Sequence, residues 1–111
     1  MDFIVKITRQ AEDDLADIYS YILTELKSYI NADAVLGRLY TEIKNLSFMA
    51  DGYHLYPKEP WNSLGIHYFS VSHYSIFYII KEIDGKQEVL VTRVANGRRD
   101  TERLLNEMKI D

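Results

Sequence analysis

Three arginines lie within one short stretch near the C-terminal end of the chain. The stretch reads VTRVANGRRD over residues 91–100 and contains Arg93, Arg98 and Arg99. We expect Arg93 near the end of a strand and a turn at Gly97, which would bring the three cations together. Guanidinium groups in such a cluster can bind phosphate or carboxylate groups through paired hydrogen bonds. The alternative is that Arg98 and Arg99 pair with neighbouring acids or with acids of the first helix, and exposed pairs of that kind contribute little.

Aromatic residues alternate along the segment before this stretch. Tyr68, Tyr74 and Tyr78 alternate with Phe69 and Phe77 over two predicted strands. Because side chains alternate between the faces of a strand, the pattern predicts one aromatic face in contact with water and one face in the core. Tyrosines beside arginines could stack on nucleic-acid bases. Packing within the sheet is the alternative interpretation.

Several other kinds of chemistry are excluded by inspection. The chain has no Gly-rich phosphate loop, no HExxH pair and no GxSxG turn, so a nucleotide enzyme or zinc protease is not expected. His54, His67 and His73 lack carboxylate neighbours at ligand spacing, and the chain has no cysteine. We therefore expect no metal site and no cofactor.

The composition is that of one soluble domain over residues 1–111. Apolar residues make up 47% and charged residues 27% of 111 residues, with a net charge of −4. Residues 1–60 carry ten acids and six bases, whereas residues 61–111 carry seven of each, so any basic surface is local and C-terminal. The longest apolar run, IFYII, is far too short to span a membrane, and we expect a cytoplasmic protein.

The N-terminal half predicts a strand followed by two helices. Residues 3–7 alternate as a strand does, and Thr8 can cap a helix whose apolar face is Leu15, Ile18, Ile22, Leu26 and Tyr29. Asn31 can cap a second helix, with Val35, Leu39, Ile43 and Leu46 on its apolar face and Gly52 at its end. These helices should form an antiparallel hairpin. A loop with two prolines follows over residues 51–64.

The C-terminal half predicts a meander of three antiparallel strands and a closing helix. The strands cover residues 66–71, 74–83 and 88–94, and Asp84 and Gly85 form a tight hairpin between the last two. Asp100 or Thr101 can cap the closing helix, which carries Leu104, Leu105 and Met108 on its inner side. The order is β-α-α-β-β-β-α, an α+β fold with the helical hairpin on one face of an antiparallel sheet. The other face would be left for binding.

The chain resembles the RelE/ParE superfamily of bacterial toxins from type II toxin-antitoxin modules, and ParE-like members more than RelE-like ones. The resemblance covers nearly the whole chain, including TRQAEDDLADIYSYI as first helix. Its most specific parts are HYSIFYII and, after a hairpin, VLVTRVANGRRD with its Gly-Arg-Arg-Asp ending. The resemblance implies the same order of elements.

Two activities occur on this scaffold, and the resemblance implies one of them. RelE-like members cut mRNA in the ribosome, which requires a base, an acid and cations close together. In this chain IHYFSV has no Lys or Arg, and RRDTERLLNEMKID has no Tyr or His. If the chain were such a ribonuclease, its candidate catalytic residues would be His67, His73, Tyr78, Arg93 and Arg98. The acidic pI, the lack of Lys or Arg in IHYFSV and the lack of a C-terminal Tyr or His favour a ParE-like toxin that binds DNA gyrase and catalyses no reaction. A non-toxic binding module is the third possibility.

The resemblance also implies a cognate antitoxin that wraps an arm over the toxin. Antitoxin arms in this superfamily are often acidic, so we expect their acids at Arg93, Arg98 and Arg99 and their apolar residues in the groove between sheet and hairpin. His67 and Asn96 stand where ParE-like chains often have Arg and His. The predicted contacts to target or antitoxin are Arg93, Asn96, Arg98, Arg99, Tyr74 and Tyr78.

Overall fold

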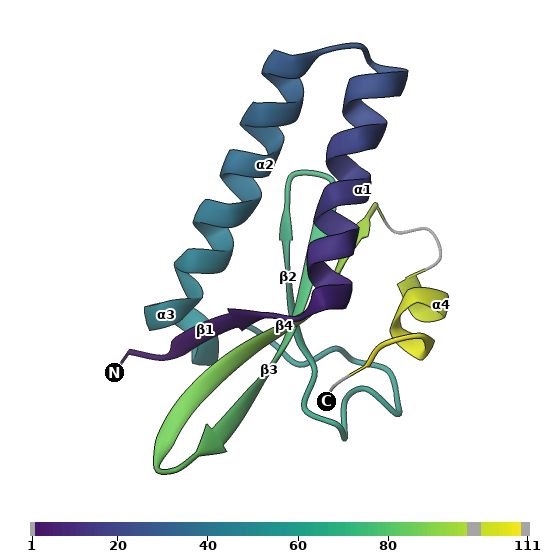
Figure 1. Cartoon of the computed structure of the whole chain (residues 1–111). Coiled ribbons are helices and arrows are strands. Elements are labelled where there is room, and N and C mark those ends of the chain that lie inside the picture. The colour runs from purple at the N-terminus through teal and green to yellow at the C-terminus, as the bar shows by residue number, and fades with distance from the viewer. Residues whose placement is uncertain (1, 98–100, 110–111) are drawn as a thin grey trace.

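The strands of this chain form one four-stranded sheet in the order β1-β4-β3-β2. The computed structural model describes residues 2–97 and 101–109. Its elements are β1 (Ile4–Ile7), α1 (Arg9–Glu25), α2 (Tyr29–Lys44), α3 (Leu46–Met49), a 3-10 turn η1 (Ala50–Gly52), β2 (His67–Val71), β3 (Tyr74–Ile83), β4 (Lys86–Asn96) and α4 (Thr101–Asn106). The predicted α+β fold and order of elements are confirmed, with α3 and η1 added after the hairpin. Helices α1 and α2 rise beside the sheet as an antiparallel pair, and α4 lies apart from them (Figure 1).

Helix α1 begins at its predicted cap and ends earlier than its apolar pattern suggests. The Thr8 side chain accepts a hydrogen bond from the Ala11 backbone N–H at 3.1 Å, which satisfies a free donor of the first turn. The buried face ends at Ile22, and Lys27 has a φ of 52°. Leu26 and Tyr29 are therefore 59% and 73% exposed, and the prediction that they continue the buried face is wrong.

Helix α2 is capped by Ser28 and not by Asn31. The Ser28 hydroxyl accepts from the Asn31 backbone N–H at 3.1 Å, so Asn31 already lies in the first turn. Helix α2 ends at Lys44, and the chain turns at Asn45 into α3 and η1 before it reaches Gly52. The expected single helix up to Gly52 is therefore two helices and a turn.

Three strands form the expected meander, and the first strand joins it from the other end of the chain. β2 pairs with β3 and β3 with β4, both antiparallel, with Asp84 and Gly85 at positive φ in the tight turn. β1 pairs with β4 in parallel, from Ile4 opposite Glu88 to Ile7 opposite Val91. The β3–β4 ladder is irregular between Phe77 and Tyr78, where Thr92 of β4 has no opposite residue.

Both faces of the sheet carry apolar side chains. The first cluster joins the helical hairpin to the sheet and includes Leu15, Leu39, Ile76 and Val91, each at most 1% exposed. The second lies on the opposite face; its buried members are Trp61, Ile66, Phe77, Ile79, Ala95 and Leu105. The expectation of an open second face is therefore wrong in part, because the proline-containing loop and α4 cover some of it. No helix among the described residues is long and apolar enough to cross a membrane.

Candidate functional site

The arginine stretch begins with a side chain that is bound inside the fold. Arg93 donates to both carboxylate oxygens of Asp14 on α1, from Nε and from Nη2, each at 2.8 Å. Its Nη1 donates to the Leu104 carbonyl of α4 at 3.0 Å. The hydrogen bond to Asp14 raises the pKa of Arg93 further above its ordinary value, although partial burial opposes this. Arg98 and Arg99 lie outside the described residues.

Besides its ion pair with Arg93, Asp14 accepts a backbone hydrogen bond at the edge of β4. β1 ends opposite Val91, so the rest of β4 has no strand beside it on that side. Thr8 donates from its backbone N–H to the Val91 carbonyl at 3.0 Å and from its hydroxyl to the Thr92 carbonyl at 3.1 Å. The Val94 N–H then donates to Asp14 Oδ2 at 2.9 Å. The start of α1 thus takes the place of a neighbouring strand.

His67 and Tyr78 are brought together across β2 and β3. Their rings stack with centroids 5.1 Å apart, and Nδ1 of His67 lies 2.9 Å from the Tyr53 carbonyl oxygen. Tyr78 is fully buried, and its hydroxyl donates to the Ala50 carbonyl. Burial raises the pKa of Tyr78 far above its ordinary value. The prediction of a wet face is therefore wrong for Tyr78, which belongs to the core.

The remaining described candidates gather at the end of the sheet beneath the hairpin. His73 is exposed in the turn between β2 and β3, and the Gly97 N–H donates to its carbonyl at 2.6 Å. Tyr74 is half-buried and lies opposite Asn96, which is exposed. This group is separate from His67 and Tyr78, which pair at the other end of β2. Among the described residues no group of His, Cys, Asp or Glu could hold a metal ion.

A groove between the sheet and the hairpin was expected from the resemblance, and two hollows lie beside this end of the sheet. One, of 310 Å³, lies between α1, the end of β4 and α4, and Tyr21, Asn96 and Leu104 line it. The other, of 170 Å³, lies between α2 and the β2–β3 turn, and Tyr74 and Arg38 line it. No sequence signal marked Arg38 or Tyr21 as surface residues of a hollow. Each lines a hollow only because its helix packs beside the end of the sheet.

A larger cleft of 850 Å³ opens on the second face of the sheet, between the proline-containing loop and α4. Tyr56, Tyr68 and Phe77 line it, with Tyr68 and Phe77 stacked at a centroid distance of 6.1 Å. Lys58 and Glu102 form an ion pair that joins the loop to α4 beside this cleft. The described lining contains no histidine, and its aromatic and charged side chains offer surface for binding.

Comparison with known proteins connects this geometry to one family. A family model described as ParE toxin of the type II toxin-antitoxin system parDE matches residues 5–101. Among solved structures, the chain is similar to a chain of the chromosomal ParDE toxin-antitoxin system from P. aeruginosa, with 22% identity and a TM-score of 0.68 over 86% of this chain and 97% of that one. It is also similar to a chain of the RelBE2 toxin-antitoxin complex from Mycobacterium tuberculosis, with 18% identity and a TM-score of 0.62 over 88% and 100%. A search of curated proteins gave no match.

Proposed function

The chain belongs to the ParE toxin family of type II toxin-antitoxin systems, and from that membership we propose that it inhibits growth by binding DNA gyrase. The observation that carries the proposal is the match of the family model over residues 5–101. ParE-like members of the superfamily poison gyrase, whereas RelE-like members cut mRNA. The toxin acts by contact and has no covalent chemistry of its own.

The positions of the candidate catalytic residues support a binding role over RNA cleavage. Cleavage needs a base, an acid and cations around one phosphate. The Tyr78 hydroxyl is buried and bound to Ala50, so it does not reach a substrate. The Arg93 guanidinium is held by Asp14 and Leu104, and His73 lies in a turn at the far end of β2 from His67.

A cognate antitoxin is the second proposed partner, and its arm lies along the groove between the hairpin and the end of the sheet. Tyr74 lines the hollow beside α2, and Asn96 lines the hollow beside α1. We assign direct contact to these two residues and to Arg98 and Arg99. Arg93 and Tyr78, being bound or buried within the fold, act by holding the surface in shape.

A supercoiling assay tests the gyrase proposal directly. Purified toxin added to gyrase and relaxed plasmid should reduce supercoiling and trap cleaved DNA, and prior mixing with the antitoxin should restore supercoiling. Unchanged supercoiling with no trapped DNA would overturn the proposal.

Expression of the toxin alone in bacteria gives an independent answer. We expect signs of DNA damage before any fall in protein synthesis. Loss of translation first, together with cut mRNA on translating ribosomes, would instead assign the chain to the RelE-like activity. Normal growth would indicate a non-toxic binding module.

A further inference from the structure

A small hollow between α2 and the β2–β3 turn has an apolar floor. Val35 and Leu39 from α2 and Val71 from the end of β2 line it, and Leu39 and Val71 are 1% and 5% exposed. Ser72 has a φ of 56°, which turns the chain sharply after β2 and leaves space beneath the helix. We call this hollow the α2 niche.

The size of the α2 niche suits a single side chain. Its volume is 170 Å³, whereas sites for small molecules usually measure about 300–1,000 Å³. A helix or a nucleotide does not fit in it. One aliphatic side chain from a partner does, in the manner of the buried anchor residues that dominate protein interfaces.

Two hydrogen-bond donors stand beside the niche, and neither has a partner among the residues that the structure describes. Arg38 is exposed on α2 and makes no hydrogen bond or ion pair with any residue that the structure describes, although Glu42 follows one helical turn later. The Tyr74 hydroxyl also lacks a hydrogen bond within the described part of the chain. Partial burial raises the pKa of Tyr74, so the hydroxyl keeps its proton at neutral pH and can donate. An apolar floor with two donors beside it fits an aliphatic residue next to a carboxylate.

We propose that the α2 niche anchors the antitoxin: one aliphatic side chain of its arm fills the niche, and a neighbouring Asp or Glu pairs with Arg38 and Tyr74. This inference rests on the proposed function, because it names a contact of the antitoxin proposed there. The antitoxin is the chosen occupant because the niche is one of the two hollows in the groove assigned to its arm. An acidic arm would also complement Arg38, which has no partner among the described residues. Arg38 is thereby the residue that selects an acidic partner.

Two substitutions test the anchor. Arg38→Glu reverses the charge beside the niche at an exposed helical position, and Ala34→Phe places a ring in the niche from an exposed position that lines it. Lys44→Glu is the matched control, since it makes the same charge change on the same helix away from the niche. The probe is the antitoxin encoded with this toxin, and its affinity for each folded variant is measured by calorimetry, with melting temperatures as a check of folding.

Both niche variants should bind the antitoxin at least about tenfold more weakly, as expected for loss of a charged hydrogen bond or of a buried anchor, and Lys44→Glu should stay within about twofold. Wild-type affinity in Arg38→Glu and in folded Ala34→Phe would overturn the anchor and leave the proposed function intact. An equal loss in Lys44→Glu would also overturn it, because general charge would then explain the effect. Failure of the wild-type toxin to bind the antitoxin at all would overturn both the anchor and the proposed antitoxin partner.

Discussion

Arg93 shows what residue type and spacing cannot decide. The sequence places it in a cluster of cations that could bind an anion from a partner. The structure gives it an anion from the same chain, Asp14, 79 positions away. Glu12, Asp13 and Asp14 all lie in the first turns of α1, where the helix dipole favours acids. Which of them would face β4 depended on the parallel pairing of β1, and no local pattern contains that information.

Asp14→Ala should lower the free energy of unfolding by about 3 kcal/mol, the usual cost of breaking a largely buried ion pair from one side. Both side chains of the pair are 11% exposed, and the substitution also leaves the Val94 N–H without its acceptor. Urea denaturation of both proteins measures the difference. Lys6→Ala is the control, because the Lys6–Glu88 pair is exposed on the lysine side and should cost less than about 1 kcal/mol. Equal losses in the two variants would contradict a structural role for Asp14.

Tyr78→Phe should lower the free energy of unfolding by about 1 to 2 kcal/mol at neutral pH, because the buried Ala50 carbonyl loses its donor. The same substitution should change the response to alkali. The pKa of Tyr78 is raised in the folded protein, so above pH of about 10 only the unfolded chain releases this proton, and stability falls by up to about 1.4 kcal/mol per pH unit. Urea midpoints between pH 8 and 11 should therefore fall less steeply in Tyr78→Phe than in the wild type. Parallel curves would show that the Tyr78 hydroxyl is not buried.

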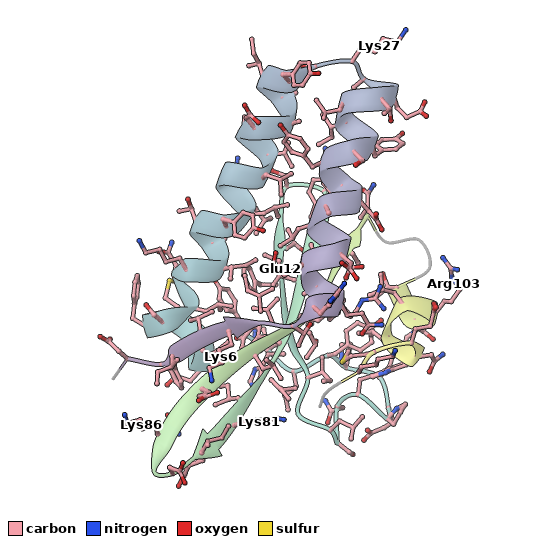
Figure 2. The ribbon with its side chains drawn as sticks, in the orientation of Figure 1. Lys6, Glu12, Lys27, Lys81, Lys86 and Arg103 are labelled. Atoms are coloured by element: carbon pink, nitrogen blue, oxygen red, sulfur yellow. The ribbon has the colours of Figure 1, made fainter. Side chains whose placement is uncertain are left out.

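The helix cap and the tight turn with strong local sequence signals were predicted correctly, whereas the boundary between α1 and α2 was not. Thr8 capped α1 as expected, and Asp84 and Gly85 made the hairpin between β3 and β4. The boundary between α1 and α2 was misplaced, because Leu26 and Tyr29 continue the helical spacing into a turn where nothing covers them. Figure 2 shows Lys27 in this turn at the far end of the hairpin, away from the sheet. Apolar spacing predicts a helix, but burial also requires a surface within reach.

Helix α4 was expected only as a closing helix, and in the structure it also covers part of the second face of the sheet. The Arg93 Nη1 donates to its Leu104 carbonyl, and the Gln10 side chain donates to the Glu107 carbonyl at 2.7 Å. Leu105 is 2% exposed and lies in the same cluster as Trp61. A helix of six residues is too short to be stable alone, so these contacts hold it in place.

Leu105→Ala should cost about 2 to 4 kcal/mol and loosen the cover of Trp61, the only tryptophan of the chain. We expect a red-shifted Trp61 emission and stronger quenching by acrylamide in the variant. Leu64→Ala is the control, because Leu64 is 55% exposed in the loop and should change neither signal. Unchanged emission and quenching in Leu105→Ala would show that α4 does not cover this face.

At the scale of the whole molecule, the parallel pairing of β1 with β4 joins the two ends of the chain. The sequence predicted the strand at residues 3–7 and the meander, but contained no sign of which strand would be its neighbour. Parallel pairing has no tight turn to mark it, and here more than 80 residues separate the partners, as the bond from Thr8 to Thr92 illustrates. The hollows around Tyr74 and Asn96 depend on this closure, since it sets where α1 and α2 lie over the sheet. Tyr74 and Asn96 of the candidate contact surface were named from the sequence, whereas Arg38, Tyr21 and the shape of the surface were not.

We propose that residues 1–111 fold as one domain, and the two apolar clusters provide a test. Phe3 is 7% exposed in the first cluster, and Trp61 is 6% exposed in the second, on the other face of the sheet. Because both clusters are built on the same strands, loss of one should unfold the other. Phe3→Leu should lower the free energy of unfolding by about 1 to 2 kcal/mol and shift the urea midpoint equally by helical circular dichroism and by Trp61 fluorescence. A helical transition that moves while the Trp61 transition stays at its wild-type midpoint would show two units that unfold separately.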